Sequence, residues 1–152
     1  MITELAIAKC IAIAVHTYSV PSSVLMGIRR VEGGRVGQQV KNKNGSYDLG
    51  PMQVNTLWLK ELARHWRVSR NTAWRWVRDD ACINANVAAW ILRQKADSAG
   101  SVYKGIAHYH SKTPKFGYPY RRKVLKAMRV RSAQKILSQR KRSVQRSVRP
   151  SG

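Results

Sequence analysis

The sequence predicts a single, mainly α-helical domain with a small extended hairpin, and three observations support this. The chain has 152 residues, which fits one domain, and 43% of them are hydrophobic, which is enough for a packed core. Apolar residues recur at helical spacings of three and four over most of the chain. Turn-forming residues of the kind found in hairpins interrupt this pattern over 38–54, where a short extended piece follows.

The first part of the chain is predicted to form two helices and the hairpin. Residues 3–18 carry apolar side chains at helical spacing, and the helix ends before Pro21, since proline at that point can start the next helix but not continue the first. The second helix runs to about Val31, where a cluster of glycines breaks it. The hairpin then occupies 38–54.

The rest of the chain is predicted to be helical apart from short loops. Asn55 and Ser69 can each cap a short helix, and Asp79 and Asp80 precede a long one, because short polar side chains accept hydrogen bonds from the unpaired N–H groups at a helix start. The further predicted helices cover 81–95, 101–109 and 120–138, and a loop with Pro114, Gly117 and Pro119 separates the last two.

The charge is strongly positive and unevenly distributed. Lys and Arg total 29 against 7 acidic residues, which gives a net charge of +22, and residues 121–152 hold 12 basic and no acidic side chains. Such a surface attracts polyanions, which include nucleic acid, anionic lipid and acidic wall polymers. We expect residues 1–127 to form the domain and residues 128–152 to be a basic helix end and tail. A basic nucleic-acid-binding module is therefore one candidate function.

Several other classes of protein are excluded or disfavoured. No window of about 18 uncharged apolar residues exists, so we expect no membrane span. Residues 1–20 are apolar, but Glu4 precedes the first basic residue, Lys9, so we interpret them as part of the fold and see no clear signal peptide. Two cysteines are too few for a disulfide-dense scaffold or a four-cysteine zinc site, and the histidines have no metal-ligand spacing. No metal or cofactor is expected.

Elimination among the seven carboxylates leaves two candidates for acid–base chemistry. Glu32 closes an apolar helical turn next to glycines, where burial would raise its pKa and keep it protonated, as a general acid requires. Asp48 follows a polar turn that could hold it ionised. The alternative is that Glu32 is an ordinary helix-end residue and Asp48 a turn residue. Ordinary explanations exist for the other five, namely Glu4 near the terminus, Glu61 on a solvated helix, Asp79 and Asp80 as caps, and Asp97 at a helix end.

Longer motifs surround these two carboxylates. The segment from Asn42 to Asn55 reads NKNGSYDLGPMQVN, and the segment from Gly105 to His110 reads GIAHYH. Three other motifs accompany them: PSSVLMGI followed by Glu32, DACIN before an alanine-rich helix, and Tyr120 with Val124. All of these motifs occur in order over about 8–127. Through these motifs the chain resembles the lysozyme-like superfamily, specifically the lytic transglycosylase (SLT) domains associated with secretion and conjugative pilus systems.

The resemblance implies cleavage of the β-1,4 bond between N-acetylmuramic acid and N-acetylglucosamine in peptidoglycan. Glu32 would protonate the glycosidic oxygen and then remove the proton of the muramic acid 6-hydroxyl, which gives a 1,6-anhydro product. The fold would be lysozyme-like, with the hairpin flanking the cleft. The implied substrate-binding positions are Gly50, Met52, Gln53, Asn55, Trp58, Tyr109, His110 and Tyr120. Two positions depart from the family pattern: Gly33 stands where serine is frequent, and His110 where asparagine is usual.

The segment around Asp48 also resembles c-type lysozymes, which places an aspartate at this position and a cleft tryptophan at Trp58. This leaves hydrolysis open, with Glu32 as the acid and Asp48 as nucleophile or stabiliser of the oxocarbenium ion. In lysozyme, two carboxylates in different environments take different roles, and this is the precedent for the pairing.

The resemblance also implies a partner, a compartment and a cross-link. Cys10 and Cys82 match positions that are paired in the subfamily, and the alternative is two buried thiols. The chain would act in the periplasm or another extracytoplasmic compartment, with peptidoglycan strands as substrate and a secretion or pilus apparatus as partner. A small arginine-rich helical subdomain with Trp66, Trp74 and Trp76 is expected to pack its rings inward, and the alternative is stacking on sugars or bases.

Overall fold

The computed structural model describes residues 2–147, and of residues 130–136 and 145–147 only the backbone. The chain is mainly helical with one small antiparallel sheet, so the predicted fold class is confirmed. The helices are α1 (Glu4–Tyr18), α2 (Ser22–Glu32), η1 (Thr56–Trp58, a 3-10 helix), α3 (Leu59–Trp66), α4 (Arg70–Asp79), α5 (Ala81–Ala99), α6 (Val102–His110) and α7 (Pro114–Ser147).

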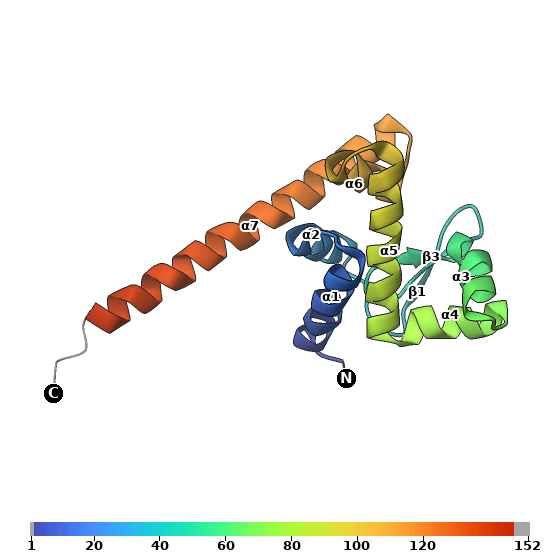
Figure 1. The fold of residues 1–152 in the computed structure, drawn as a ribbon, viewed down its shortest axis with the longest axis horizontal. Coiled ribbons are helices and arrows are strands. Elements are labelled where there is room, and N and C mark those ends of the chain that lie inside the picture. The colour runs from blue at the N-terminus through green and yellow to red at the C-terminus, as the bar shows by residue number, and fades with distance from the viewer. Residues whose placement is uncertain (1, 148–152) are drawn as a thin grey trace.

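The central helix is α5, and the other elements are arranged around it (Figure 1). Helices α1 and α2 lie on one side of it, and the sheet with α3 and α4 lies on the other. Helix α6 packs against α5, and α7 packs against α6 and α2. The core between these elements consists of fully buried aliphatic side chains, such as Ile11 of α1, Ile28 of α2 and Leu92 of α5. Removing such surface from water is the main force that stabilises the arrangement.

The sheet has three short antiparallel strands in the order β1 (Gln39–Lys41), β2 (Tyr47–Leu49) and β3 (Val54–Asn55). The hairpin predicted for 38–54 corresponds to β1 and β2, and β3 is an addition. In the register, Asp48 stands opposite Val40 on one side and Asn55 on the other. The sheet therefore places Asp48 on its middle strand.

Helix caps lie where the sequence predicts them, with one exception. The side chains of Asn55, Ser69 and Asp80 accept hydrogen bonds from N–H groups at the starts of η1, α4 and α5. Asp79 does not cap a helix, since its carboxylate pairs with the Arg78 guanidinium at 2.7 Å. The three caps satisfy donors that have no partner within the helix.

Helix α7 differs from the prediction at both ends. The expected loop over 114–119 is wrong: the helix begins at Pro114, a position at which a helix needs no N–H group. Gly117 allows this turn to approach α6, because a Cβ there would lie 2.4 Å from the carbonyl oxygen of Ser111. The sequence predicts a helix end near Ser138, whereas the helix continues to Ser147. Residues 148–152 of the predicted tail lie outside the described residues.

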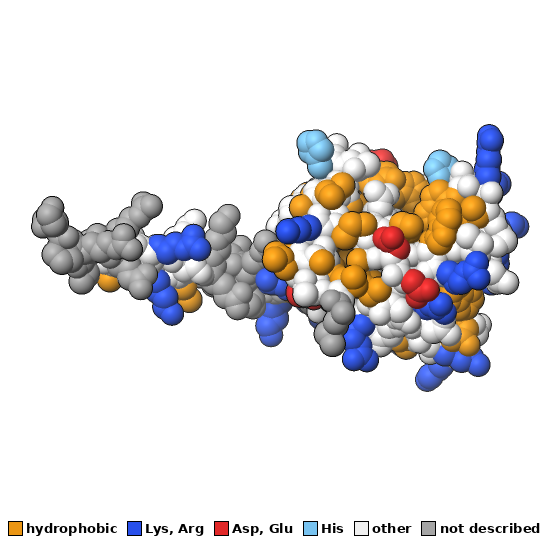
Figure 2. Space-filling model, turned by 90° about the horizontal axis from the view of Figure 1, so that it is seen from below, with side chains coloured by type: hydrophobic (Ala, Val, Ile, Leu, Met, Phe, Trp, Pro, Cys, Tyr) orange, Lys and Arg blue, Asp and Glu red, His pale blue; other side chains and the backbone are white. Residues whose placement is uncertain are grey.

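Three further features concern the molecule as a whole. Cys10 of α1 and Cys82 of α5 form a disulfide across 72 residues of sequence. In the part of the chain that the structure describes, no helix has the length and apolar character needed to cross a bilayer. The C-terminal half of α7 extends away from the body and carries Lys and Arg side chains (Figures 1 and 2).

Candidate active site

A groove of about 680 Å³ runs between the sheet and η1 on one side and α5 and α6 on the other. Residues from five parts of the chain line it. They include most of the residues that the sequence singles out, namely Glu32, Asp48, Gln53, Asn55, Trp58, Tyr109 and His110. Elements distant in sequence thus bring the predicted residues together in one cavity.

Glu32 is the last residue of α2, and Gly33 ends the helix in the left-handed conformation with φ of 60°. The Glu32 Oε1 accepts a hydrogen bond of 2.8 Å from the Tyr120 hydroxyl of α7. Burial raises the pKa of Glu32 to about 7, the Tyr120 hydrogen bond opposes this rise, and the Asp48 charge adds to it. The side chain is therefore a carboxyl group that can hold or release a proton near neutral pH.

Tyr120, which contacts Glu32, belongs to a group of stacked aromatic rings. The buried Tyr120 ring stacks on the His110 ring, with centroids 4.7 Å apart, and lies nearly parallel to the Tyr109 ring at 6.3 Å. Burial raises the pKa of both tyrosine hydroxyls, with the Glu32 charge contributing, so each remains a protonated donor. Burial lowers the pKa of His110, and the nearby Lys123 contributes to this. The Glu32 carboxyl is thus held by a hydroxyl whose ring cannot easily move.

Asp48 lies on the opposite wall of the groove, on β2. Its Oδ1 accepts a hydrogen bond of 2.9 Å from the Asn55 side chain, the residue opposite it in the sheet. The same Asn55 amide donates to Ser46, and its oxygen caps η1. The cross-strand pair therefore fixes the orientation of the Asp48 carboxylate, and its charge acts on Glu32 across the groove.

The segment that follows β2 is fixed by a buried asparagine of α5. The Asn84 side chain is fully buried, accepts a hydrogen bond from the Met52 N–H, and donates to the carbonyls of Leu49 and Val77. Gly50 has φ of 68°, and a Cβ there would lie 2.6 Å from the Asn84 amide. Only glycine fits so close to this side chain in that conformation. The backbone under the groove is therefore determined by α5.

A second buried anchor is Arg29 of α2. Its guanidinium donates to the carbonyls of Gly34 and Pro51 at 2.9 and 3.0 Å and pairs with Glu4 of α1 at 2.8 Å. The sequence does not reveal this pair, since it predicts Glu4 only as an ordinary residue near the terminus. A signal existed, because Arg29 lies four residues after the fully buried Leu25, on the apolar face of its helix. Asn84 shows the same signal, because it lies three residues after Ala81 and four before Ala88, which are both buried.

Gln53 and Trp58 line the groove beyond this segment. Gln53 adopts a positive φ of 51°, which is uncommon for a residue other than glycine, and its amide donates to the Gly50 carbonyl at 2.9 Å. Trp58 packs edge-to-face on Trp90 of α5 at 5.4 Å, and Lys95 lies over its ring. Residues in rare backbone conformations concentrate at functional sites, so the Gln53 geometry supports a role there.

Three predicted site residues are not in the lining of this groove. Gly50 and Met52 are buried beneath it, where the Met52 side chain belongs to the core and its carbonyl accepts a 3.5 Å contact from the Tyr109 hydroxyl. Tyr120 stands behind Glu32 and lines a smaller cavity on its other side. No cluster of potential metal ligands occurs among the described residues.

Comparison with models of known protein families identifies the family of this chain. The model of the transglycosylase SLT domain matches residues 9–116, which is more than two thirds of the chain. The chain belongs to the transglycosylase SLT domain family. Membership indicates a glycosidase-like activity of the lytic transglycosylase type, with peptidoglycan as the substrate. A search of curated proteins gives no match to this SLT domain.

Proposed function

We propose that this SLT domain cleaves the β-1,4 bond between N-acetylmuramic acid and N-acetylglucosamine, with Glu32 as both general acid and general base. The proposal rests on one observation: the Glu32 carboxyl borders the groove, and its pKa is raised to about 7. A carboxyl with such a pKa is protonated often enough near neutral pH to act as an acid, and its conjugate base is strong enough to accept a proton later.

In the first step, Glu32 gives its proton to the glycosidic oxygen as the bond from that oxygen to C1 of the muramic acid breaks. N-acetylglucosamine leaves with a free hydroxyl, and C1 becomes positively charged. The ionised Glu32 then removes the proton of the muramic acid 6-hydroxyl while that oxygen bonds to C1. The product is the 1,6-anhydro sugar, Glu32 is protonated again, and no water is consumed.

The surrounding residues position the reacting groups. The Tyr120 hydroxyl orients the Glu32 carboxyl and stabilises it when it is ionised between the two steps. The Gln53, Asn55 and His110 side chains line the groove and offer hydrogen-bonding groups to sugar hydroxyl and acetamido groups. Gly50 and Met52 support this surface from below through Asn84.

A muramidase activity is the second candidate, and the position of Asp48 favours it. Asp48 borders the same groove as Glu32 and is held in place by Asn55. In that reaction Asp48 would act as nucleophile or stabilise the positive charge at C1, and water would complete the cleavage. The two reactions differ in product: the transglycosylase leaves anhydro ends, and the muramidase leaves reducing ends.

Mass spectrometry of fragments released from purified sacculi tests both candidates. The transglycosylase predicts anhydro ends, which Glu32→Gln abolishes and Asp48→Asn leaves at a comparable rate. The muramidase predicts reducing ends, with both variants inactive. An active Glu32→Gln variant, or no release of fragments by the parent protein, contradicts the assignment of this residue.

The setting of the reaction is part of the same proposal. Peptidoglycan lies outside the cytoplasm, and a disulfide persists in such oxidising compartments, so we assign the chain to the periplasm or an equivalent space. There it opens the wall locally for a secretion or pilus apparatus. The basic end of α7 would hold it on anionic polymers, and nucleic acid is the alternative ligand for that helix. Salt-sensitive DNA binding without any effect on sacculi would favour a non-enzymatic role.

A further inference from the structure

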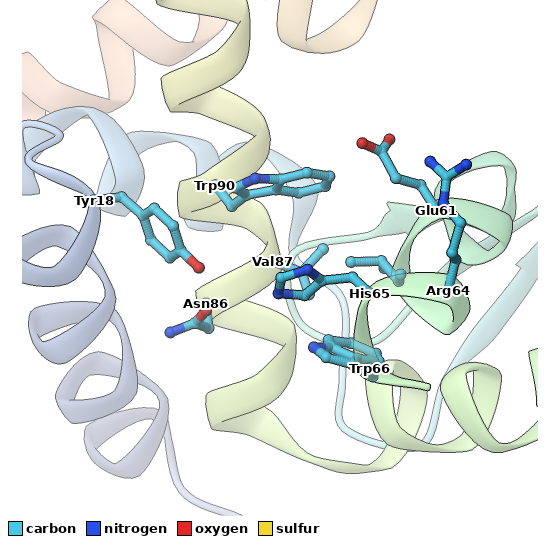
Figure 3. Close-up of a pocket in the computed structure, with 9 residues that line it drawn as sticks. Tyr18, Glu61, Arg64, His65, Trp66, Asn86, Val87 and Trp90 are labelled. Atoms are coloured by element: carbon cyan, nitrogen blue, oxygen red, sulfur yellow. The ribbon is translucent and has the colours of Figure 1, made fainter. Parts of the chain in front are cut away.

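A second cavity, of about 220 Å³, lies between α1, α3 and α5, outside the groove (Figure 3). Three aromatic side chains from these three helices border it: Tyr18, Trp66 and Trp90. Figure 3 shows the Trp90 ring extending from α5 toward Glu61 of α3, and the His65 ring, the Tyr18 hydroxyl and the Asn86 amide gathering below it.

The lining combines ring faces with hydrogen-bonding groups. Among the described residues, no hydrogen bond joins the Tyr18 hydroxyl, the Asn86 amide or the His65 ring to another part of the chain. These groups are thus available to a ligand. Flat aromatic faces bind the C–H faces of sugar rings, and amides and hydroxyls bind their polar edges. A purely apolar ligand would leave the polar groups without partners, which is costly.

The cavity continues the groove along α5. Trp58 of the groove packs edge-to-face on Trp90, which forms a wall of the cavity. Glu61 borders both spaces. On α5, Ile91 and Lys95 line the groove, and Val87, four residues before Ile91, lines the cavity on the same face of the helix. A glycan strand that leaves the groove at Trp58 therefore meets this cavity next.

We propose that this cavity is a sugar-binding site that takes one N-acetylated sugar residue of the glycan strand whose scissile bond lies at Glu32. The volume fits this choice, because sites for larger ligands measure roughly 300–1,000 Å³, so about 220 Å³ holds a single ring. The site increases affinity for long strands and plays no part in bond cleavage. In naming the same strand as the occupant, the proposal rests on the proposed function.

Binding is tested first with the inactive Glu32→Gln protein. The probes are N-acetylglucosamine and its β-1,4-linked tetramer, and the readout is the NMR signal of each tryptophan indole N–H. The proposal predicts that both probes shift the Trp66 signal, because Trp66 lines the cavity and not the groove, whereas Trp90 also contacts Trp58 of the groove. Adding Asn86→Ala or Tyr18→Phe should weaken this binding about fivefold, since each removes one hydrogen-bonding group. Asn71→Ala, on the exposed surface of α4, is the matched control and should have no effect.

The kinetic test uses the active protein and two substrates, long glycan strands and short oligosaccharides that span only the groove. Asn86→Ala should raise KM for long strands about fivefold, with kcat unchanged, and leave both constants for short substrates unaltered. Circular dichroism and the melting temperature check that the variants are folded. An equal effect on both substrates overturns the proposal.

The two tests separate this inference from the proposed function. If the parent protein releases no anhydro fragments but the Trp66 signal shifts with the sugars, the site is supported and the catalytic assignment fails. If the protein is active but the sugars leave the Trp66 signal unchanged, the catalytic assignment stands and the sugar-binding site is refuted.

Discussion

At the scale of single residues, the proposed chemistry depends on the pKa of Glu32, on which two influences act in opposite directions. Burial in the groove wall favours the protonated carboxyl, whereas the Tyr120 hydroxyl donates to the ionised form and favours that. Burial is the larger influence, and the pKa reaches about 7. Burial therefore makes the carboxyl easily protonated, and the Tyr120 hydrogen bond keeps it well oriented.

The raised pKa has a cost in stability that can be measured. Below about pH 4.5, the ordinary value, Glu32 is protonated in both the folded and the unfolded chain. As the pH rises toward 7, the unfolded chain loses this proton first, so the folded state becomes less stable. We predict that Glu32→Gln raises the free energy of unfolding by up to about 3 kcal/mol above pH 7 and has no such effect below pH 4.5. Urea unfolding at several pH values measures this, and a pH-independent difference contradicts it.

Tyr120→Phe removes the hydroxyl and keeps the ring. The pKa of Glu32 should then rise further, because the hydrogen bond that stabilises its ionised form is lost. We expect kcat/KM on sacculi to fall roughly tenfold or more, since the carboxyl is less well positioned, and the alkaline limb of the pH profile to move to higher pH. A purely structural role of the hydroxyl would lower the rate without moving that limb. Tyr118→Phe, at an exposed position of the same helix, is the control.

The sequence predicts Glu32 and Asp48 for reasons that are local. An acidic residue at the end of an apolar helical turn and another in a polar turn can be recognised from neighbours in the chain. The Arg29–Glu4 pair joins residues 25 positions apart, and the positive φ of Gln53 depends on how the whole segment packs. Such features arise from tertiary contacts. Periodicity places Arg29 on the apolar face of its helix, but it identifies neither the partner of Arg29 nor the conformation of Gln53.

At the scale of elements, the most important connection is the one between α5 and the segment after β2, because it fixes the backbone under the groove. Asn84 makes three buried hydrogen bonds, one from the Met52 N–H and two to the carbonyls of Leu49 and Val77. We predict that Asn84→Ala lowers the free energy of unfolding by about 3 kcal/mol or more, because each unpaired group costs about 1–3 kcal/mol. Activity should fall even where the protein remains folded. Thermal unfolding and turnover of sacculi measure both effects, and Ser98→Ala on the exposed end of α5 serves as the control.

Helix ends show which features of the fold can be predicted from the sequence and which cannot. Asn55, Ser69 and Asp80 are found as caps because capping depends on a few adjacent residues. The start of α7 escapes sequence analysis because Pro114, Gly117 and Pro119 together are typical of a loop. In the structure, Pro114 occupies the first position of the helix, and Gly117 leaves room for α6. This close approach is determined by the packing of the two helices. The absence of Gly and Pro from 120–147 is the sequence feature that agrees with the longer helix.

At the scale of the whole molecule, the Cys10–Cys82 disulfide connects the first helix to the central one. Replacing both cysteines by alanine frees a segment of 72 residues in the unfolded chain. In the chain-entropy description, we predict a loss of about 4 kcal/mol in the free energy of unfolding. The midpoint of urea unfolding measures this. The parent protein with a reducing agent should behave like the double variant, and an unchanged midpoint in both contradicts the prediction.

The extension of α7 has a practical consequence for handling the protein. From Tyr120, which holds Glu32, the helix continues for 27 residues to Ser147, a distance of about 40 Å. A dye, affinity tag or surface linkage attached at this end is remote from the groove. The same attachment beside Glu4 would adjoin the ion pair to Arg29, whose other contacts hold the backbone next to the acid. Labelled preparations should therefore be made at the C-terminal end of α7.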